Sequence, residues 1–373
     1  MKILLIEPFF SGSHKQWAKD WQQNSSHQIE LLTLPGHHWK WRMHGAAVTL
    51  ANQFNASVDK NFDVIIASDM LDVALFKSLT AKHTAHIPFA LYFHENQLTY
   101  PWSATDADVP LKRDNHYAFI NYTSALAADT ILFNSAYHQT SFIEALPTFL
   151  KQFPDFQNLE TVETIKTKSK VLPLGLNLQR LNELKPATIE KYPRCLILWN
   201  HRWEYDKNPE LFFETLFTLH EHGIDFRLAV LGESFSNVPP IFQKAKEVLA
   251  EKIVHWGYIE SEKEYAEWLW KADLLPVTSK QDFFGASVVE AMYCNVVPFL
   301  PKRLAYSEHI PETYHPTFFY DEEDFTAKLQ KRIMDVKYLR AMNTQQWVEK
   351  YDWKNIVVVY DELMKMIVEQ SSV

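Results

Sequence analysis

Short apolar runs alternate along the chain with longer amphipathic segments. In the first half, the apolar runs cover residues 2–8, 28–34, 63–69, 88–94 and 130–134, and helices are predicted over residues 15–23, 73–80 and 115–128. Strands that are apolar along their whole length are typical of a parallel sheet that helices cover on both faces. We therefore predict a doubly wound α/β unit here. Residues 146–170, which contain Pro147 and Pro154, are predicted to be less regular.

The same alternation restarts after a polar linker, residues 182–193. Strands are predicted over residues 195–199, 226–231, 253–257, 274–278, 296–300 and 317–320, and helices over residues 208–222, 241–251, 262–271, 286–295 and 324–369. The predicted fold class is thus α/β, with two doubly wound Rossmann-like domains that face each other across a cleft. We place the domains at 1–175 and 176–350, followed by a final helix at 351–373. Ligands of such sheets bind at the carboxyl ends of the strands, near the point where the strand order reverses.

Composition narrows the class of protein. The chain has 373 residues, of which 47% are hydrophobic, with 12 Trp and a net charge of -9. The negative charge argues against broad nucleic-acid binding but leaves room for a local basic patch. The two cysteines, Cys195 and Cys294, form neither a disulfide framework nor a zinc motif, so we expect a cytoplasmic protein. No run approaches the ~18 apolar residues that a membrane span needs.

Residues 279–292, SKQDFFGASVVEAM, follow a predicted strand and open a helix. Gly285 stands where a sharp strand-to-helix turn needs a permissive backbone. Asp282 precedes the helix and Glu290 lies inside it, near a helix N-terminus that attracts anions. A polar turn that caps a helix, with Glu290 merely solvated, is the alternative interpretation of this stretch by itself.

A pair of cations follows the first strand of the second domain. Arg202 and Lys207 lie in a loop before a helix, with Asn208-Pro209 as its predicted N-cap and first residue. Two cations at a strand end form a diphosphate clamp, unless they simply pair with Glu204 and Asp206. Together with the carboxylates of the later motif they suit one nucleotide-sugar site. The cations would neutralise the leaving diphosphate, and the carboxylates would accept hydrogen bonds from sugar and ribose hydroxyls.

These two motifs together resemble the donor site of retaining glycosyltransferases of the GT-B fold. The resemblance implies that Asp282 binds sugar hydroxyls, Glu290 binds the ribose, and Phe284, Gly285, Ala286 and Ser287 line the donor site. It also implies that the final helix packs back on the first domain. Most relatives have Glu where this chain has the shorter Asp282.

Motifs of the first domain narrow the resemblance. The stretches EPFFSGSH (7–14), PGHHWKWR (35–42) and FHENQLTYP (93–101), with WNHRW (199–203), resemble the tRNA-queuosine alpha-mannosyltransferase family. The family implies transfer of mannose from GDP-mannose to queuosine in tRNA with retention at the anomeric carbon. The resemblance to retaining GT-B glycosyltransferases implies that His94, at the end of the fourth strand, contacts the donor sugar. A histidine held by its own loop, with Glu95 as its partner, is the alternative. Together with His94, we assign Arg202, Lys207 and Asp282 to catalysis.

Acceptor candidates gather in the loops of the first domain. His38, Trp39, Lys40, Trp41 and Arg42 combine cations with two indoles in a predicted loop, a pattern that suits base stacking and phosphate contact. The same residues could instead stack a sugar ring or pack locally. Gly12 would let the backbone approach donor or acceptor, and Ser13 or His14 could then donate a hydrogen bond to either substrate. A tight turn that serves the fold alone is the alternative. Glu95, Asn96 and Gln97 offer partners for hydroxyl groups, and Asn134, at the end of the fifth strand, is a further donor-site candidate.

The predicted function is a metal-independent retaining glycosyltransferase without a cofactor, whose partners are a nucleotide sugar and tRNA. Two alternatives stay open. One keeps the fold but takes a lipid, glycan or small-metabolite acceptor, and the other is a non-catalytic RNA-binding protein on this fold. The sequence leaves the oligomeric state undetermined.

Overall fold

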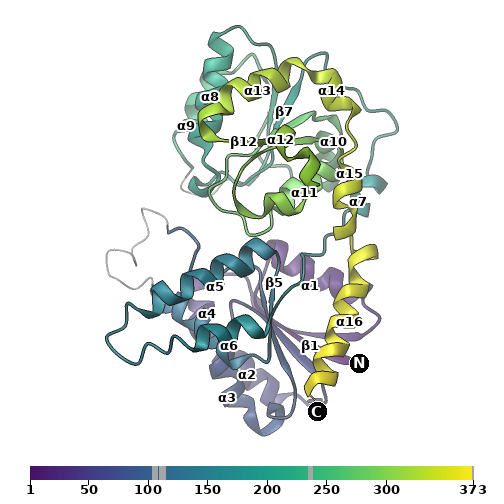
Figure 1. The fold of residues 1–373 in the computed structure, drawn as a ribbon. Coiled ribbons are helices and arrows are strands. Elements are labelled where there is room, and N and C mark those ends of the chain that lie inside the picture. Colours follow the sequence, from purple (N-terminus) through teal and green to yellow (C-terminus); the bar gives the residue numbers. More distant parts are fainter. Residues whose placement is uncertain (103–107, 109–114, 234–237, 372–373) are drawn as a thin grey trace. The chain divides into compact units, whose positions relative to one another are not determined.

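A computed structural model describes residues 1–102, 108, 115–233 and 238–371. Within these residues the chain forms two six-stranded parallel sheets, each in its own compact unit (Figure 1). The first unit comprises Met1–Leu176 with Trp353–Val373, and the second comprises Asn177–Asp352. The boundary thus lies next to Gly175, and the last helix belongs to the first unit.

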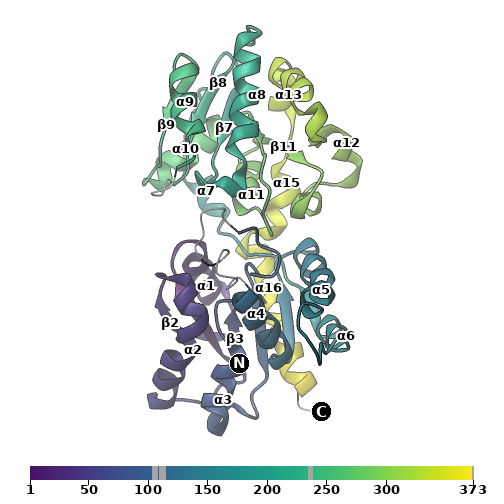
Figure 2. The same cartoon turned by 90° about the vertical axis from the view of Figure 1, so that its left-hand side faces the viewer.

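The first sheet has the strand order β2-β1-β3-β4-β5-β6, so the order reverses at β1. Its strands are β1 (Lys2–Phe10), β2 (Gln28–Pro35), β3 (Val64–Ser68), β4 (Phe89–Phe93), β5 (Thr130–Phe133) and β6 (Ser169–Val171). The helices of this unit are α1 (Gly12–Asn24), α2 (Trp39–Ala56), α3 (Val73–Thr84), α4 (Asn115–Ala127), α5 (Ala136–Leu150), α6 (Thr161–Thr167) and α16 (Trp353–Ser371). Figure 2 shows the same unit from the side, with α16 drawn in yellow.

Alternate strand residues of this sheet face two different layers. Leu4 and Ile6 of β1 pack in one core with side chains from α2 to α6. On the other face, Trp17 of α1 stacks on Tyr92 of β4, with 4.8 Å between ring centroids. The Tyr360 hydroxyl of α16 donates to the Pro173 carbonyl at 2.8 Å and accepts from Trp17 Nε1 at 3.1 Å. The final helix is therefore part of the first core.

The second sheet has the order β12-β11-β10-β7-β8-β9, and here the order reverses between β7 and β10. Its strands are β7 (Leu196–Trp199), β8 (Arg227–Val230), β9 (Ile253–Trp256), β10 (Leu274–Pro276), β11 (Val297–Pro301) and β12 (Phe319–Tyr320). The α-helices are α7 (Gln179–Glu183), α8 (Pro209–Glu221), α9 (Ile241–Val248), α10 (Glu262–Lys271), α11 (Ala286–Tyr293), α12 (His315–Phe318), α13 (Phe325–Met334), α14 (Val336–Ala341) and α15 (Gln345–Val348). Short 3₁₀ turns include η1 (Tyr205–Lys207), η2 (Leu304–Glu308), η3 (Glu312–Tyr314), η4 (Glu322–Asp324) and η5 (Glu349–Tyr351).

Three local predictions were wrong. Residues 39–42 were placed in a loop but form the first turn of α2, which begins after His38 in a left-handed conformation without a side-chain cap. The sequence features that usually mark a helix N-terminus, a side-chain cap and acidic residues in the first turn, are absent from α2. Helix α1 begins at Gly12 rather than near Lys15. Helix α5 runs through Pro147, which lies in its last turn.

The start of α8 was predicted in part. Pro209 occupies the first turn of the helix as expected. Asn208 precedes it, but with φ of 51° and without a side-chain cap hydrogen bond. Across the described ranges, no helix combines the length and apolarity that crossing a membrane requires.

We predict that Tyr360→Phe lowers the free energy of unfolding by about 1–3 kcal/mol, because the buried Trp17 N–H loses its acceptor. Denaturant unfolding measures the effect. Val359→Ala, on the half-exposed side of the same helix, is the matched control and should change stability by less than about 0.5 kcal/mol. Equal losses in the two variants would contradict a bracing role for the tyrosine hydroxyl.

Candidate active site

The two donor motifs of the second unit meet where the strand order of their sheet reverses. Lys207 ends the short η1 turn after β7, and Asp282 lies in the loop between β10 and α11. Strands β7 and β10 are neighbours, paired through Ile197 and Leu274. Because both strands end at the same sheet edge, residues that are far apart in sequence become adjacent.

Lys207 is buried among partners. Its Nζ lies 3.0 Å from Asp206 Oδ2, 3.0 Å from Asp282 Oδ1 and 2.9 Å from the Gln281 carbonyl oxygen. Burial by itself would lower the pKa of Lys207, but the charges of Asp282 and Asp206 raise it above its ordinary value. All three ammonium protons thus have acceptors, and Lys207 joins the two motifs directly. The sequence interpretation had placed these side chains on different parts of the donor.

Arg202 has a different environment. Its side chain is 49% exposed, and Nη2 lies 3.2 Å from Glu204 Oε2. The pairing with Glu204 is the alternative that the sequence left open. The two cations therefore differ in role. The Lys207 ammonium group is buried and bonded to the protein, whereas Arg202 presents its planar guanidinium to solvent.

Asp282 is held on both carboxylate oxygens. Lys207 donates to Oδ1, and the Tyr306 hydroxyl donates to Oδ2 at 2.5 Å. Burial would raise the pKa of Asp282, but the charge of Lys207 and these hydrogen bonds lower it below its ordinary value. The carboxylate therefore stays ionised and can only accept hydrogen bonds, as binding to sugar hydroxyls requires.

Glu290 projects from the second turn of α11 into a second polar cluster. Arg180 of α7 donates to Oε1, and the Tyr265 hydroxyl donates to Oε2 at 2.9 Å. Asn200 Nδ2 donates to the Ser287 carbonyl oxygen at 2.9 Å and lies 3.4 Å from the Tyr265 hydroxyl oxygen. Glu290 is therefore a bonded carboxylate, not the solvated one of the alternative interpretation. The sequence analysis missed Arg180 and Tyr265, because only the fold brings α7 and α10 to this carboxylate.

The segment from Phe284 to Ser287 has mixed surroundings. Gly285 has φ of +86° and allows the turn into α11, whose first residue is Ala286. Ser287 Oγ lies 3.0 Å from His201 Nδ1, and buried His201 has a pKa lowered to about 4 by desolvation. The Phe284 ring is buried against His309 and Tyr351. The Phe284 side chain thus belongs to the core, and the expected donor contact of this residue stays a prediction.

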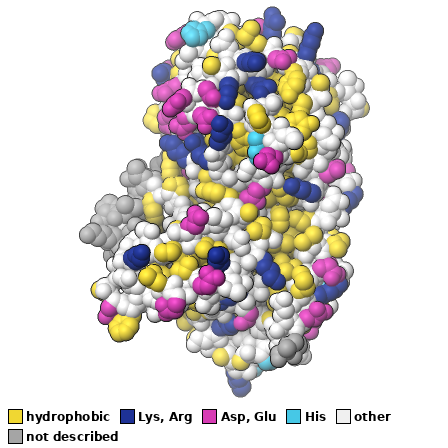
Figure 3. Space-filling view, in the orientation of Figure 1, with side chains coloured by type: hydrophobic (Ala, Val, Ile, Leu, Met, Phe, Trp, Pro, Cys, Tyr) yellow, Lys and Arg dark blue, Asp and Glu magenta, His cyan; other side chains and the backbone are white. Residues whose placement is uncertain are grey.

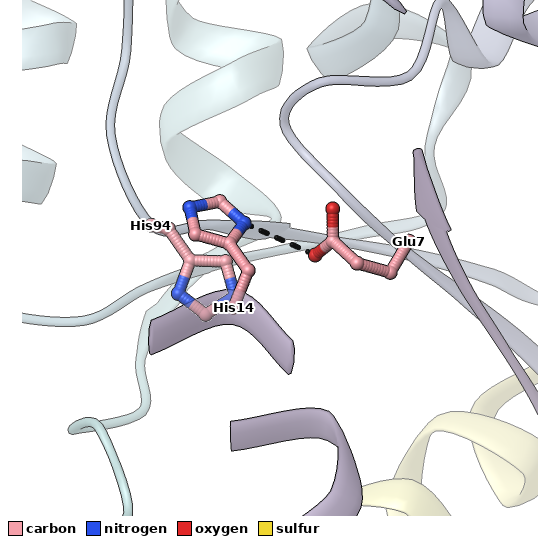
Figure 4. A group of neighbouring side chains, drawn as sticks. All are labelled: Glu7, His14 and His94. Atoms are coloured by element: carbon pink, nitrogen blue, oxygen red, sulfur yellow. Dashed lines mark hydrogen bonds and ion pairs between the residues drawn. The ribbon is translucent and has the colours of Figure 1, made fainter. Parts of the chain in front are cut away.

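At the carboxyl edge of the first sheet, charged groups gather at β1, β3 and β4. His14 Nδ1 lies 3.1 Å from Glu7 Oε2, and the His14 and His94 ring centroids are 4.2 Å apart (Figure 4). Asp69 accepts from the His94 backbone N–H at 2.8 Å. The sequence analysis missed Glu7 as a site residue in its own right and missed Asp69, because both lie within or next to apolar strands.

The two histidines are in opposite protonation states. Burial would lower the pKa of His14, but the charge of Glu7 outweighs it and raises the pKa to about 9. The pKa of His94 is lowered well below its ordinary value by burial and by the charge of His14. His94 is thus neutral, and its buried Nε2 has no hydrogen-bond partner among the residues that the structure describes. A ring nitrogen in this state suits a substrate hydroxyl.

The remaining residues of the β4 and β5 loops are mostly bonded to the protein. Asn96 is fully buried, and its Oδ1 accepts from the Leu98 and Thr99 backbone N–H groups. Its expected contact with the acceptor stays a prediction. Gln97 Nε2 donates to Glu95 Oε1 at 3.0 Å. Asn134 Nδ2 donates to the His94 carbonyl oxygen at 2.9 Å, which makes it a support for His94.

The candidates at the start of α2 form an aromatic and basic group. Trp39 packs on Tyr117, with 5.1 Å between centroids, and the Lys40 ammonium lies 5.4 Å from the Trp102 ring centroid and pairs with Asp108. Trp41 is 63% exposed. The other four predicted residues line the same sheet edge with different exposure: Ser13, Gly12 and His38 are exposed, and Arg42 donates from Nε to the Pro35 carbonyl oxygen.

Comparison with known proteins places this geometry in a family. Residues 2–176 match the tRNA-queuosine alpha-mannosyltransferase N-terminal family, and residues 183–346 match glycosyl transferases group 1. Over 317 residues the chain is 36% identical to the tRNA-queuosine alpha-mannosyltransferase of Drosophila melanogaster, across 83% of this chain and 82% of the relative.

The chain belongs to the tRNA-queuosine alpha-mannosyltransferase family.

It is accordingly a glycosyltransferase, as its second unit also indicates. Solved structures agree in fold. Sucrose-phosphate synthase from Thermosynechococcus elongatus superposes with a TM-score of 0.70 at 13% identity, covering 99% of this chain and 100% of that one. The Anabaena HepE protein in complex with UDP superposes with a TM-score of 0.65 at 13% identity, covering 98% and 100%. The GT-B fold predicted from the sequence is thereby confirmed.

Three side chains of the first unit have the residue types and the spacing of a possible metal site. Among the described residues, Glu7, His14 and His94 offer ligand atoms that all lie within 4.8 Å of one another. Imidazoles bind metal as neutral groups, whereas His14 is protonated and paired with Glu7. We interpret the group as an ion pair beside a neutral histidine, and metal independence stays a prediction.

We predict that the free energy of unfolding falls as pH rises from 6.5 to 9, with about 3 kcal/mol of the loss coming from His14. The folded protein holds the His14 proton up to a pKa of about 9, so this stabilisation is complete below pH 6.5 and is lost through pH 9. Burial raises the pKa of nearby Asp69 to about 8, and its proton is lost in the same direction. Thermal or denaturant unfolding across this range measures the slope.

His14→Gln should remove the contribution of His14 to the pH dependence of the free energy of unfolding. The smaller pH dependence that remains would come from Asp69. His86→Gln, an exposed histidine of the same unit, is the control and should keep the wild-type dependence. A wild-type stability that does not change with pH in this window would refute the charged state of His14.

Proposed function

We propose that this glycosyltransferase moves mannose from GDP-mannose to a hydroxyl of queuosine in tRNA, with retention at the anomeric carbon. The observation that carries the proposal is the joining of Lys207 and Asp282 at the reversal point of a sheet, in a chain 36% identical to a tRNA-queuosine alpha-mannosyltransferase. The structurally similar Anabaena HepE protein binds UDP, and UDP together with glucose, which supports a nucleotide-sugar donor.

The second unit supplies the groups that a nucleotide sugar needs. The exposed guanidinium of Arg202 would bind the diphosphate and stabilise the charge that develops as it leaves. Asp282, ionised and fixed by Lys207, would accept hydrogen bonds from sugar hydroxyls. Glu290 would exchange part of its contact with Arg180 or Tyr265 for ribose hydroxyls.

The first unit would supply the sugar contact and the acceptor surface. Within the described part of the chain, Nε2 of the neutral His94 has no hydrogen-bond partner, and it would bind a hydroxyl near the reacting carbon. In the transfer, the bond between the anomeric carbon and the phosphate oxygen breaks, and a bond to the queuosine oxygen forms on the same face. The proton of the attacking hydroxyl passes to the leaving phosphate oxygen, so no protein nucleophile is needed.

Trp41 is suited to stack on a base of the acceptor. A Cβ on Gly45, one turn later in α2, would lie 2.7 Å from the Trp41 ring, so the indole lies flat against the helix only because residue 45 has no side chain. Glycine inside a helix costs about 0.5–1 kcal/mol relative to alanine. In return for this cost, the Trp41 indole presents an aromatic face to solvent.

On the face of the molecule shown in Figure 3, Lys and Arg are interspersed with Asp and Glu, so contacts of that face with phosphates would be local.

We predict that labelled mannose is transferred from GDP-mannose to tRNA that carries queuosine, and not to the same tRNA with guanosine at that position. Parallel reactions with UDP-glucose, ADP-glucose and a lipid extract identify the donor and test the alternative acceptor.

Arg202→Ala should lower kcat by about 100-fold or more with an unchanged melting temperature. Lys263→Ala, an exposed cation on α10, is its control. Transfer to lipid but not to either tRNA would overturn the proposed acceptor.

We predict that Trp41→Ala raises KM for tRNA by about 5- to 100-fold, because one base loses its stacking partner. Hydrolysis of the donor in the absence of tRNA should not change. Phe156→Ala removes another strongly exposed ring of the first unit and serves as the control. Equal loss of transfer and donor hydrolysis would move Trp41 from the acceptor surface to the donor site.

A further inference from the structure

The 3₁₀ turn that follows β11, η2, is built against the donor motif. Arg303, just before η2, donates from Nε to the Ser279 carbonyl oxygen at 3.1 Å and from Nη2 to the Thr278 carbonyl oxygen at 3.3 Å. Its Nη1 pairs with Glu322 Oε1 at 2.6 Å. A guanidinium that binds two successive backbone carbonyls fixes the course of the loop that leads to Asp282.

Tyr306, in the middle of η2, lies beneath the same loop. Its side chain is fully buried, and a Cβ on Gly285 would lie 3.0 Å from its ring. The ring therefore fills the space that the glycine leaves. Its hydroxyl donates to Asp282 Oδ2 at 2.5 Å. Burial and the charge of Asp282 raise the pKa of Tyr306 well above its ordinary value, so the phenol keeps the proton that it donates.

Asp282 is consequently clamped from two elements. Lys207 holds Oδ1 from the β7 side, and Tyr306 holds Oδ2 from the β11 side. An ionised carboxylate has about four lone-pair sites, so each oxygen can accept one further hydrogen bond. The Asp282 side chain is 17% exposed, which leaves one open side for a ligand. The clamp determines where that open side points.

We propose that Tyr306 is a positioning residue for the donor sugar, and that Tyr306 and the short Asp282 form a matched pair that sets the depth at which the sugar hydroxyls bind. This inference rests on the proposed donor site. One more methylene would move the carboxylate outward by about 1.5 Å. A glutamate at this position would meet the Tyr306 hydroxyl or turn away from Lys207, so acid length and tyrosine hydroxyl must change together.

The test is a double-mutant cycle of Asp282→Glu and Tyr306→Phe, read on the donor alone. Calorimetry compares the affinity for the nucleotide sugar with the affinity for the nucleoside diphosphate without sugar. Tyr306→Phe should weaken binding of the nucleotide sugar by about tenfold and leave binding of the diphosphate within about twofold, because only the sugar contacts Asp282. Tyr338→Phe, a tyrosine on α14, is the matched control and should alter neither affinity.

Asp282→Glu should lose about tenfold or more of the affinity for the nucleotide sugar, and adding Tyr306→Phe should recover a large part of that loss. Additive losses, or a Tyr306→Phe variant that weakens both ligands equally, would overturn the proposal. Should Asp282→Glu fail to fold, the comparison of the two ligands in Tyr306→Phe decides by itself. If the wild type binds the donor but ignores queuosine tRNA, the proposed acceptor fails while this test still stands.

Discussion

A buried lysine between two carboxylates is the interaction on which the second unit depends. Removing a charge from water costs several kcal/mol, and only close partners offset that cost. Lys207 meets this condition because Asp206, Asp282 and the Gln281 carbonyl surround its ammonium group. The contact also ties the loop after β7 to the loop after β10. The stability of the unit and the geometry of the proposed donor site thus depend on the same ion pair. A substitution that breaks this ion pair should destabilise the fold and also disturb the site.

The first unit uses a related arrangement at the edge of its own sheet. Glu7 within β1 pairs with His14 at the start of α1, and burial together with the charge of His14 keeps the neighbouring His94 neutral. In both units an internal ion pair therefore contributes to the protonation state of a group that we propose contacts substrate: an ionised Asp282 and a neutral His94. Such pre-organisation reduces the reorganisation that substrate binding would otherwise require.

Much of the architecture followed from local patterns. The fully apolar strands indicated two parallel sheets, because a strand that is buried on both faces needs no polar side. Residue 175, where the first domain was expected to end, is next to the boundary between the compact units. Segments without such patterns were misjudged. Helix α2 begins without an acidic first turn or a side-chain cap, and its tertiary contacts through Met43, Ala47 and Leu50 stabilise it instead.

By itself the sequence determined the fold class, the family resemblance and the motif residues Arg202, Lys207, Asp282 and Glu290, since these depend on periodicity and on short stretches of residue types. Only the tertiary structure decided what these residues touch. Tyr306, Arg180 and Tyr265 reach the two carboxylates from elements far away in the chain. Phe284 and Asn96, which stand inside motifs, turned out to be buried. The physical reason is that parallel strands bring their carboxyl ends to one edge, so neighbours there are set by strand order rather than by spacing in the sequence.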